Sequence, residues 1–262
     1  MRTALPRLVG VVHLAPLPGS PRAGASLAAV VDAAAADARA LAEAGFDAVL
    51  VENYGDAPFY PGTVPAVTVS AMTACALAVR QAAPRLALGL NVLRNDAEAA
   101  LALALAAGGA FVRINVHSGA RVTDQGLVEG RAHETLRARR ALGLEHVALF
   151  CDVDVKHSAG FRPLLDEARE LAERSLADAL LVTGKATGSA VAPSELEEVA
   201  RAVDRPVYVA SGATPENLGR YATAHGIIVG SCLRRSGHAG DPVDFDAARR
   251  FAEAFRRARP GD

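Results

Sequence analysis

Short apolar segments alternate with longer amphipathic segments along the whole chain, and this alternation constrains the fold more than any other feature. The apolar segments have the length of β-strands and almost no polar face, as is typical of strands buried on both sides. The segments between them carry apolar residues at helical spacing and often end at glycine. The predicted strands span residues 8–13, 47–52, 86–91, 110–115, 146–157, 179–183, 206–210 and 226–229.

A helix is predicted after each strand. The predicted helices are 26–44, one within 68–83, 95–108, one ending at 143, one after 161–163, one from 193, one from 214 and 244–259. The helix from 214 is indicated by Thr214-Pro-Glu-Asn217, with a capping residue and proline at the first helical position. Strands joined by helical crossovers form a parallel sheet, and eight such units favour a closed (βα)8 TIM barrel over an open α/β sheet.

The length of the chain fits one such barrel. It has 262 residues, and a barrel of this type usually has about 250. Hydrophobic residues make up 51% of the sequence, which is enough for a large core. Because no linker or change of composition divides the chain, we predict a single domain over residues 1–262.

Charge and hydropathy exclude several classes of partner. The formal net charge is −1, so nothing favours nucleic acid or an anionic membrane surface as a ligand. No apolar run reaches the roughly 18 residues of a membrane-spanning helix, and the first residues lack the pattern of a signal peptide. Cys75, Cys151 and Cys232 are scattered, as expected for buried thiols in a reducing compartment. We therefore expect a cytoplasmic protein.

The segment 146–157 combines a buried strand with a charged end. Residues 147–151 are apolar, and then Asp152, Asp154 and Lys156 alternate with two valines. Successive side chains of a strand point to opposite faces, so these three charges are predicted to emerge on one side. Since α/β barrels carry their chemistry where the strands end, this segment is predicted to form part of an active site.

Polar residues also follow the other predicted strands. In a TIM barrel the carboxyl ends of all eight strands meet at one face, so these residues are expected to converge. Buried charges must be paired or used, and a structural role alone explains so many polar strand ends poorly. The candidate catalytic residues are His13, Glu52, Asp152, Lys156 and Lys185, and the candidate substrate-binding residues are Asn53, Asn91, Arg113, Asn115, Asp154 and Thr183.

Glycine-containing turns after the last two strands predict a phosphate site. Ser211 and Gly212 precede a predicted helix, and Gly230 and Ser231 form a second turn beside them. Backbone N–H groups, hydroxyls and a helix N-terminus bind anions, and TIM barrels often use these two loops for phosphate. Arg234 or Arg235 could add charge there, although two ordinary tight turns remain an alternative.

The protonation state of the two lysines determines which reactions the site can catalyse. A desolvated lysine beside a second cation can lose its proton and act as a base or form a Schiff base. Asp152 and Asp154 would instead hold Lys156 charged, as an electrostatic clamp, a general acid or one member of a structural ion pair. Lys185 lies between Gly184 and Gly188, where a solvated loop lysine is the alternative. His13 and Glu52 are candidates for an acid/base pair from adjacent strands.

Metal and cofactor motifs are weak or absent. His13, Glu52, Asp152, Asp154 and His157 form a hard-ligand set that suits a loosely held Mg²⁺ better than zinc, and no zinc-type spacing occurs. A nucleophile elbow and a dinucleotide-binding glycine fingerprint are also missing. We predict no cofactor and leave Mg²⁺ as an alternative.

Several longer motifs resemble the BtpA/SgcQ family of TIM-barrel proteins over nearly the whole chain. They include Val12-His-Leu-Ala-Pro-Leu-Pro-Gly-Ser-Pro21 and Asp152-Val-Asp-Val-Lys-His-Ser158, together with residues 52–59, 113–116, 182–188 and 211–217. The resemblance implies a barrel similar to the ribulose-phosphate-binding barrels, and with it a phosphate site. It also links the chain to a family named after photosystem I biogenesis, whose other members resemble proteins of sugar-utilisation operons. No defined reaction comes with it.

Three functions are compatible with these observations. The first is an enzyme acting on a phosphorylated sugar or a nucleotide-like metabolite by isomerase, lyase/aldolase or glycosyl-transfer chemistry. The second is a non-catalytic assembly or stabilisation factor for a membrane complex, and the third is a metal-dependent hydrolase. The polar strand ends favour the first, because a docking protein needs no converging carboxylates and lysines. We expect a small phosphorylated substrate and a homo-oligomer.

Overall fold

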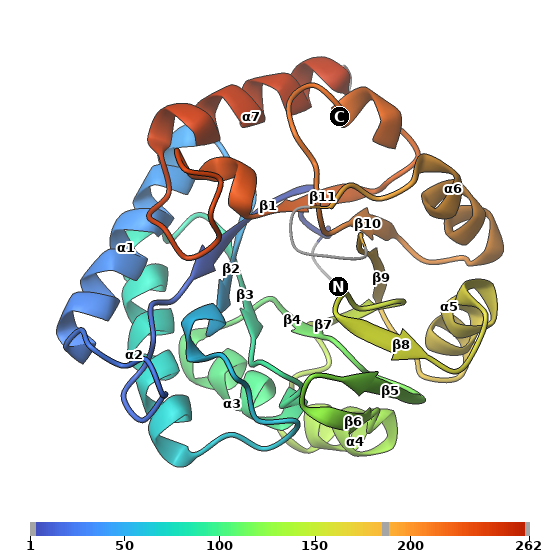
Figure 1. Cartoon of the computed structure of the whole chain (residues 1–262), viewed down its shortest axis with the longest axis horizontal. Helices are drawn as coiled ribbons and strands as arrows, with labels where there is room; N and C mark the ends of the chain where they lie inside the picture. The colour runs from blue at the N-terminus through green and yellow to red at the C-terminus, as the bar shows by residue number, and fades with distance from the viewer. Residues whose placement is uncertain (1–3, 185–188, 260–262) are drawn as a thin grey trace.

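The structure is a closed barrel of eight parallel strands surrounded by helices (Figure 1). It is a computed structural model that describes residues 4–184 and 189–259. The barrel strands are β1 (Leu8–His13), β2 (Ala48–Glu52), β3 (Ala87–Asn91), β4 (Phe111–Ile114), β7 (Ala148–Asp152), β9 (Ala179–Val182), β10 (Val207–Val209) and β11 (Gly226–Val229). Their order in the barrel, β1-β11-β10-β9-β7-β4-β3-β2, confirms the predicted TIM barrel.

Seven α-helices lie outside the strands in the described part of the chain. They are α1 (Leu27–Ala44), α2 (Ala66–Ala82), α3 (Ala97–Ala107), α4 (Ala132–Ala141), α5 (Leu164–Glu173), α6 (Pro193–Ala202) and α7 (Phe245–Ala258). Ser26, Asp96 and Asp244 cap three of them by accepting the backbone N–H three residues further on. Their apolar faces pack on the outer face of the barrel and form the larger of the buried clusters.

The helix predicted from Thr214 is wrong. That part of the chain contains only a short 3-10 helix, η2 (Leu218–Tyr221). The side chain of Asn217 accepts the N–H of Thr214 and donates to the carbonyl of Gly212, which closes a turn where the helix was expected to start. Leu218 and Tyr221 are nevertheless buried, so this turn covers the barrel where a helix was expected.

A small antiparallel sheet was not predicted at all. Strands β5 (Ala120–Thr123), β6 (Gly126–Glu129) and β8 (Ser158–Gly160) pair in the order β6-β5-β8 at the carboxyl-terminal end of the barrel (Figure 1). The sequence signal was present, because alternating residues in 120–129 flank an Asp124-Gln125-Gly126 turn.

The interior of the barrel below the site is filled by apolar side chains. The rings of Phe111 and Phe150 lie 4.6 Å apart, and Tyr208 lies 4.9 Å from Phe150. Gly89 makes room for this packing, because a Cβ there would lie 2.2 Å from Cζ of Phe111. The barrel interior is therefore a packed core, and the candidate cavity lies above it at the carboxyl ends of the strands.

Candidate functional site

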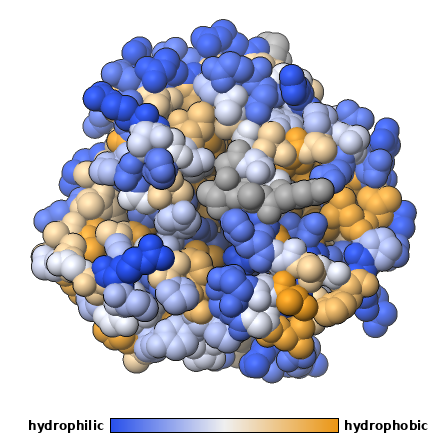
Figure 2. All heavy atoms as spheres, viewed as in Figure 1, coloured by the Kyte–Doolittle hydropathy of each residue, from blue (hydrophilic) through white to orange (hydrophobic). Residues whose placement is uncertain are grey.

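A cavity of about 680 Å³ lies at the carboxyl-terminal ends of the barrel strands. This volume is in the usual range for small-molecule sites. Figure 2 shows this face of the molecule, where hydrophilic residues surround a hollow towards the centre. Nine of the predicted site residues line the cavity: His13, Glu52, Arg113, Asn115, Lys156, Ser211, Gly212, Gly230 and Ser231.

The period of the strands explains why polar side chains reach the cavity floor. Residues two apart on a strand share a face, so Arg113 follows Phe111 inside the barrel and Asp152 follows Phe150. In the same way Glu52 follows Leu50, whose side chain belongs to the interior cluster. In these three strands the last inward position is therefore polar, whereas the position before it belongs to the core.

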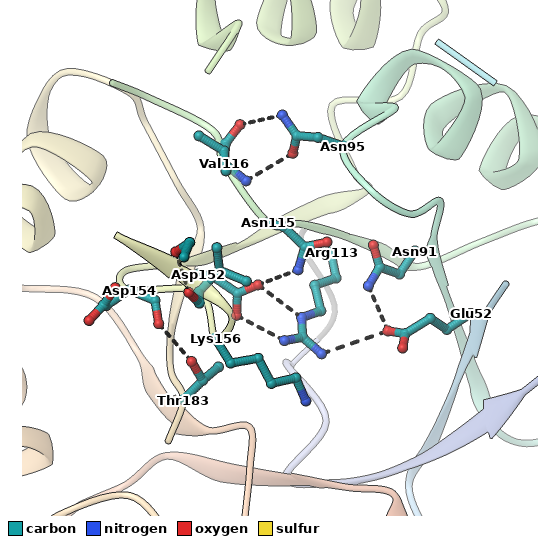
Figure 3. A network of polar contacts seen from close by, with 12 residues as sticks. Glu52, Asn91, Asn95, Arg113, Asn115, Val116, Asp152, Asp154, Lys156 and Thr183 are labelled. Atoms are coloured by element: carbon teal, nitrogen blue, oxygen red, sulfur yellow. Dashed lines mark hydrogen bonds and ion pairs between the residues drawn. The ribbon is translucent and has the colours of Figure 1, made fainter. Parts of the chain in front are cut away.

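Arg113 is the centre of a buried polar network (Figure 3). Its Nε and Nη2 donate to the two carboxylate oxygens of Asp152 at 3.2 and 3.0 Å, and its Nη1 lies 3.8 Å from Oε2 of Glu52. Asn115 donates to Asp152 at 2.6 Å, and Asn91 donates to Glu52 at 2.7 Å. Burial alone would lower the pKa of Arg113, but Asp152 and Glu52 hold that pKa above its usual value. The arginine is therefore a permanent cation on the cavity floor.

His13 faces the same carboxylate from β1. Its Nε2 lies 3.9 Å from Oε1 of Glu52, and its ring lies 4.7 Å from the ring of Tyr54. Burial lowers the pKa of His13 well below its usual value, and the neighbouring cations Arg234, Lys156 and Arg113 lower it further. A neutral imidazole beside a carboxylate can accept a proton from a bound ligand.

Lys156 enters the cavity from the segment after β7. Burial lowers its pKa, and Arg113 lowers it further, while Glu52 and Asp152 oppose the shift. Its ammonium makes no hydrogen bond or ion pair with the described residues, and Figure 3 shows its side chain extending past Arg113. The sequence left the direction of this shift open. In the structure the pKa moves downwards, towards an amine that can act as a base or nucleophile.

The strand alternation predicted for 152–156 does not persist, because β7 ends at Asp152. Asp154 is exposed, and its carboxylate accepts from Nη1 of Arg121 on β5 at 2.5 Å. The long-range ion pair turns Asp154 away from Asp152 and Lys156, so the three charges do not lie in line.

Other predicted residues lie behind the cavity wall. Asn53 is buried, accepts the N–H of Leu93 at 2.7 Å and donates to Asp56 at 3.1 Å. Thr183 donates to the carbonyl of Asp154 at 2.6 Å. Asn91, Asp152, Asp154 and Thr183 likewise do not line the cavity, and Lys185 lies outside the described residues.

The two turns predicted to bind phosphate lie side by side on the cavity wall. Gly212 has φ +67°, and a Cβ there would lie 2.3 Å from the carbonyl oxygen of Ser189. Gly230 approaches His13 so closely that a Cβ would lie 2.8 Å from its Cε1. Both positions thus require glycine for a close approach of the chain.

The two arginines considered for the phosphate site have other contacts. Arg234 is buried and donates to the carbonyls of Val11, Gly230 and Asp241, so it braces the turn after β11. The side chain of Arg235 is exposed and pairs with Asp244 at 3.4 Å.

The cavity is also lined by residues that the sequence did not predict, among them Arg94, Tyr54, Arg22 and Asp124. Arg94 lies three residues after the end of β3, and Asp124 lies at the tip of the β5–β6 hairpin. A search limited to the last residue or two of each strand misses them.

In the described residues, no group of three or more His, Cys, Asp or Glu side chains is placed to hold a metal ion. No helix in the described part of the chain has both the length and the hydropathy needed to cross a membrane.

The closed parallel barrel and its polar cavity define a TIM-barrel protein with a small-molecule type of site at the strand ends. The chain belongs to the BtpA family, whose model matches residues 5–257. It is 43% identical to the photosystem I biogenesis protein BtpA of Synechocystis over 95% of this chain and 87% of that protein. An uncharacterized protein of Pyrococcus furiosus is 42% identical over 92% of each chain.

Solved structures with the same fold are remote in sequence. The M. tuberculosis tryptophan synthase structure has a TM-score of 0.61 at 18% identity, covering 96% of this chain and 93% of that chain. Thiamine phosphate pyrophosphorylase from Pyrococcus furiosus has a TM-score of 0.60 at 15% identity, covering 96% of each chain. The (S)-3-O-geranylgeranylglyceryl phosphate synthase of Thermoplasma acidophilum has a TM-score of 0.59 at 14% identity, covering 96% of this chain and 94% of that chain. These similarities establish the fold.

Proposed function

We propose that this protein is an enzyme acting on a phosphorylated sugar or a nucleotide-like metabolite. The observation that carries the proposal is that one cavity is lined both by the turns after β10 and β11 and by Lys156, Arg113 and Glu52. The turns contain Gly212 and Gly230, where the sequence predicts that phosphate binds, and the other three residues can supply the chemistry. The phosphate would anchor the substrate while its reacting carbon faces the lysine and the carboxylate.

The composition of the chain supports a role for Lys156 that arginine cannot take. Of the 28 basic residues, 26 are arginine and two are lysine. Both lysines, Lys156 and Lys185, follow barrel strands in the sequence. Arginine supplies positive charge almost everywhere else, yet its guanidinium stays protonated in proteins. A lysine in a desolvated cavity is what a reaction requires when it uses a free amine, either as a base or as the nucleophile that forms a Schiff base.

His13 and Glu52 would move the proton in such a reaction. The neutral imidazole and the carboxylate lie on the floor beside Arg113, which stabilises negative charge that develops on a substrate oxygen. Isomerisation, aldol or lyase cleavage, and glycosyl transfer all need a proton to be moved next to a charged oxygen. The known structures with this fold include a thiamine phosphate pyrophosphorylase and a synthase bound to sn-glycerol-1-phosphate, which supports a phosphorylated substrate.

The test is turnover of a panel of sugar phosphates and nucleotides followed by ³¹P NMR, with borohydride added in parallel. If an imine forms, reduction leaves a covalent adduct, and only two lysines have to be searched by mass spectrometry. Lys156→Arg keeps the positive charge and removes the titratable amine, so we expect activity to fall about 10³-fold or more. A parallel Lys185→Arg variant applies the same test to the second candidate lysine. Full activity in Lys156→Arg, or no turnover and no binding across the panel, contradicts the proposal.

A second function is favoured by one observation, the name of the 43% identical Synechocystis relative. A biogenesis factor acts through its surface and does not need the cavity. Complementation of a strain that lacks the protein therefore separates the two. Loss of complementation in Lys156→Arg supports the enzyme, whereas full complementation supports the biogenesis factor.

A further inference from the structure

Arg94 is a buried cavity residue that the proposed reaction does not use. It is 6% exposed and lines the cavity. Among the described residues its side chain makes one hydrogen bond, from Nη2 to the backbone carbonyl of Lys156 at 2.8 Å. Its Nε is buried and has no hydrogen-bond partner in residues 4–184 and 189–259. A guanidinium offers five N–H donors, and a donor left unpaired in the interior is costly unless a ligand satisfies it.

Arg94 does not stand beside a carboxylate that would explain it. Arg113 already forms ion pairs with Asp152 and Glu52. Asp152 and Asp124 also act on Arg94 through space, but Asp152 is already paired with Arg113, and Asp124 is exposed at the hairpin tip and neutralises less charge. Lys156, next to Arg94, has no ion-pair partner among the described residues either.

Arg94 therefore places a positive charge, without a carboxylate partner among the described residues, at one end of the cavity. Arg94 and Lys156 come from the segments after β3 and β7, on the side of the barrel away from the β10 and β11 turns. We propose that Arg94, beside the proposed reactive amine of Lys156, binds a second anionic group of the substrate, a carboxylate or a second phosphate. The substrate would then be a phosphorylated sugar acid or a sugar bisphosphate. This inference rests on the proposed phosphate site at Gly212 and Gly230.

A purely structural role for Arg94 has a different consequence. If its bond to the carbonyl of Lys156 were its whole function, Arg94 would position the lysine and would contribute equally to the binding of singly and doubly anionic ligands. An anion-binding role affects only ligands that carry the second charge. The two roles are therefore separated by pairs of ligands that differ in that charge alone.

Isothermal titration calorimetry on the purified chain uses two such pairs. Glucitol 6-phosphate and 6-phosphogluconate differ by a carboxylate, and fructose 6-phosphate and fructose 1,6-bisphosphate differ by a phosphate. We expect the wild type to bind the doubly anionic member of at least one pair about tenfold or more tightly, as a charge-assisted hydrogen bond provides. The pair that shows the preference identifies the second group.

Arg94→Gln should abolish this preference and leave affinity for the singly charged member within about threefold. Arg94→Lys should retain part of it, and circular dichroism checks that both variants fold. Equal affinity of the wild type within both pairs overturns the second anion site and leaves the phosphate site standing. An equal loss for both members in Arg94→Gln overturns it as well, because that pattern is the structural role. If the wild type binds none of the four compounds, the phosphate site itself fails, and the second site fails with it.

Discussion

Arg113 and Asp152 show how a fully buried charge is tolerated in this barrel. The pair is bidentate, and Asn115 donates to the carboxylate, so the donors and acceptors of the two groups are largely satisfied. Such pairs add little net stability, because desolvation offsets the attraction, but they keep a charge in a defined place. At this position the defined charge faces a cavity, which is where a reaction can use it.

Histidine 117 is a buried residue outside the cavity whose protonation is coupled to folding. Its Nε2 lies 2.9 Å from the carbonyl oxygen of Ser175, and its Nδ1 is buried with no hydrogen-bond partner in the described structure. Burial lowers the pKa of His117 to about 4, although the hydrogen bond to Ser175 opposes the shift. The folded protein therefore favours the neutral ring.

We predict that His117 makes the folded protein less stable in acid. The ordinary histidine pKa is about 6.5. The contribution of neutral His117 to the free energy of unfolding is therefore complete above pH 6.5 and is lost as the pH falls towards 4. The unfolding free energy of the wild type relative to His117→Gln should fall by about 3 kcal/mol between pH 7 and pH 4. Urea titrations at several pH values measure it, with exposed His133→Gln as control. A pH-independent difference for His117→Gln contradicts the prediction.

The side chain of Arg121 on β5 ties the small sheet to the segment after β7 and to α5. Its guanidinium donates to Asp154, to Glu167 on α5, to Ser158 at 3.2 Å and to the carbonyl of Val153 at 3.1 Å. These contacts hold the segment that carries Lys156. An element that looks peripheral in Figure 1 thus positions a candidate catalytic residue.

Replacing Arg121 with methionine should release this segment. Methionine keeps the apolar stem but leaves Asp154 and Glu167 without their partner, at a cost of about 3 kcal/mol. We expect hydrogen exchange to increase in residues 153–160 and β5, while strands β1 to β4 remain protected. Arg131→Met removes an exposed pair with Glu134 and should change little. Increased exchange across all barrel strands would show that Arg121 supports the whole fold instead.

The barrel as a whole closes only when the two ends of the chain meet. Strand β1 pairs with β11, so Leu8 lies opposite Ile227. Helix α7 packs beside α1, and the side chain of Asp37 on α1 accepts the N–H of Val243 at 2.9 Å. Unfolding of α7 is therefore expected to be coupled to unfolding of the barrel. Assembly into a homo-oligomer stays a prediction, which light scattering can measure.

Two phenylalanines of α7 test this closure. Phe251 is fully buried, whereas Phe245, on the same helix, is 41% exposed. Phe251→Ala should lower the unfolding free energy by about 3–5 kcal/mol, and Phe245→Ala by less than about 1 kcal/mol. Circular dichroism and tyrosine fluorescence should give the same midpoint for each variant. A separate early transition in Phe251→Ala would mean that α7 unfolds independently of the barrel.

Local sequence patterns were enough to predict the barrel and the end at which the cavity lies. Strand and helix periods are local properties, so eight apolar segments with helical crossovers are visible without coordinates. The same period places Glu52, Arg113 and Asp152 at the last inward position of their strands. At Thr214 the same reasoning predicted a helix where the chain forms a turn, and it missed the β5–β6 hairpin although the sequence carries its signal.

Only the tertiary structure decided which polar groups share the cavity. Asp154 was grouped with Lys156 by strand parity, but Arg121 turns it outwards, and no local pattern contains that ion pair. Arg94 lies far from Lys156 in the sequence, and its hydrogen bond to the lysine carbonyl forms because β3 and β7 belong to one closed barrel. The lowered pKa of Lys156 also depends on burial beside Arg113, which the chain creates only when the barrel closes. Electrostatics act through space, and the distances that govern them exist only in the folded molecule.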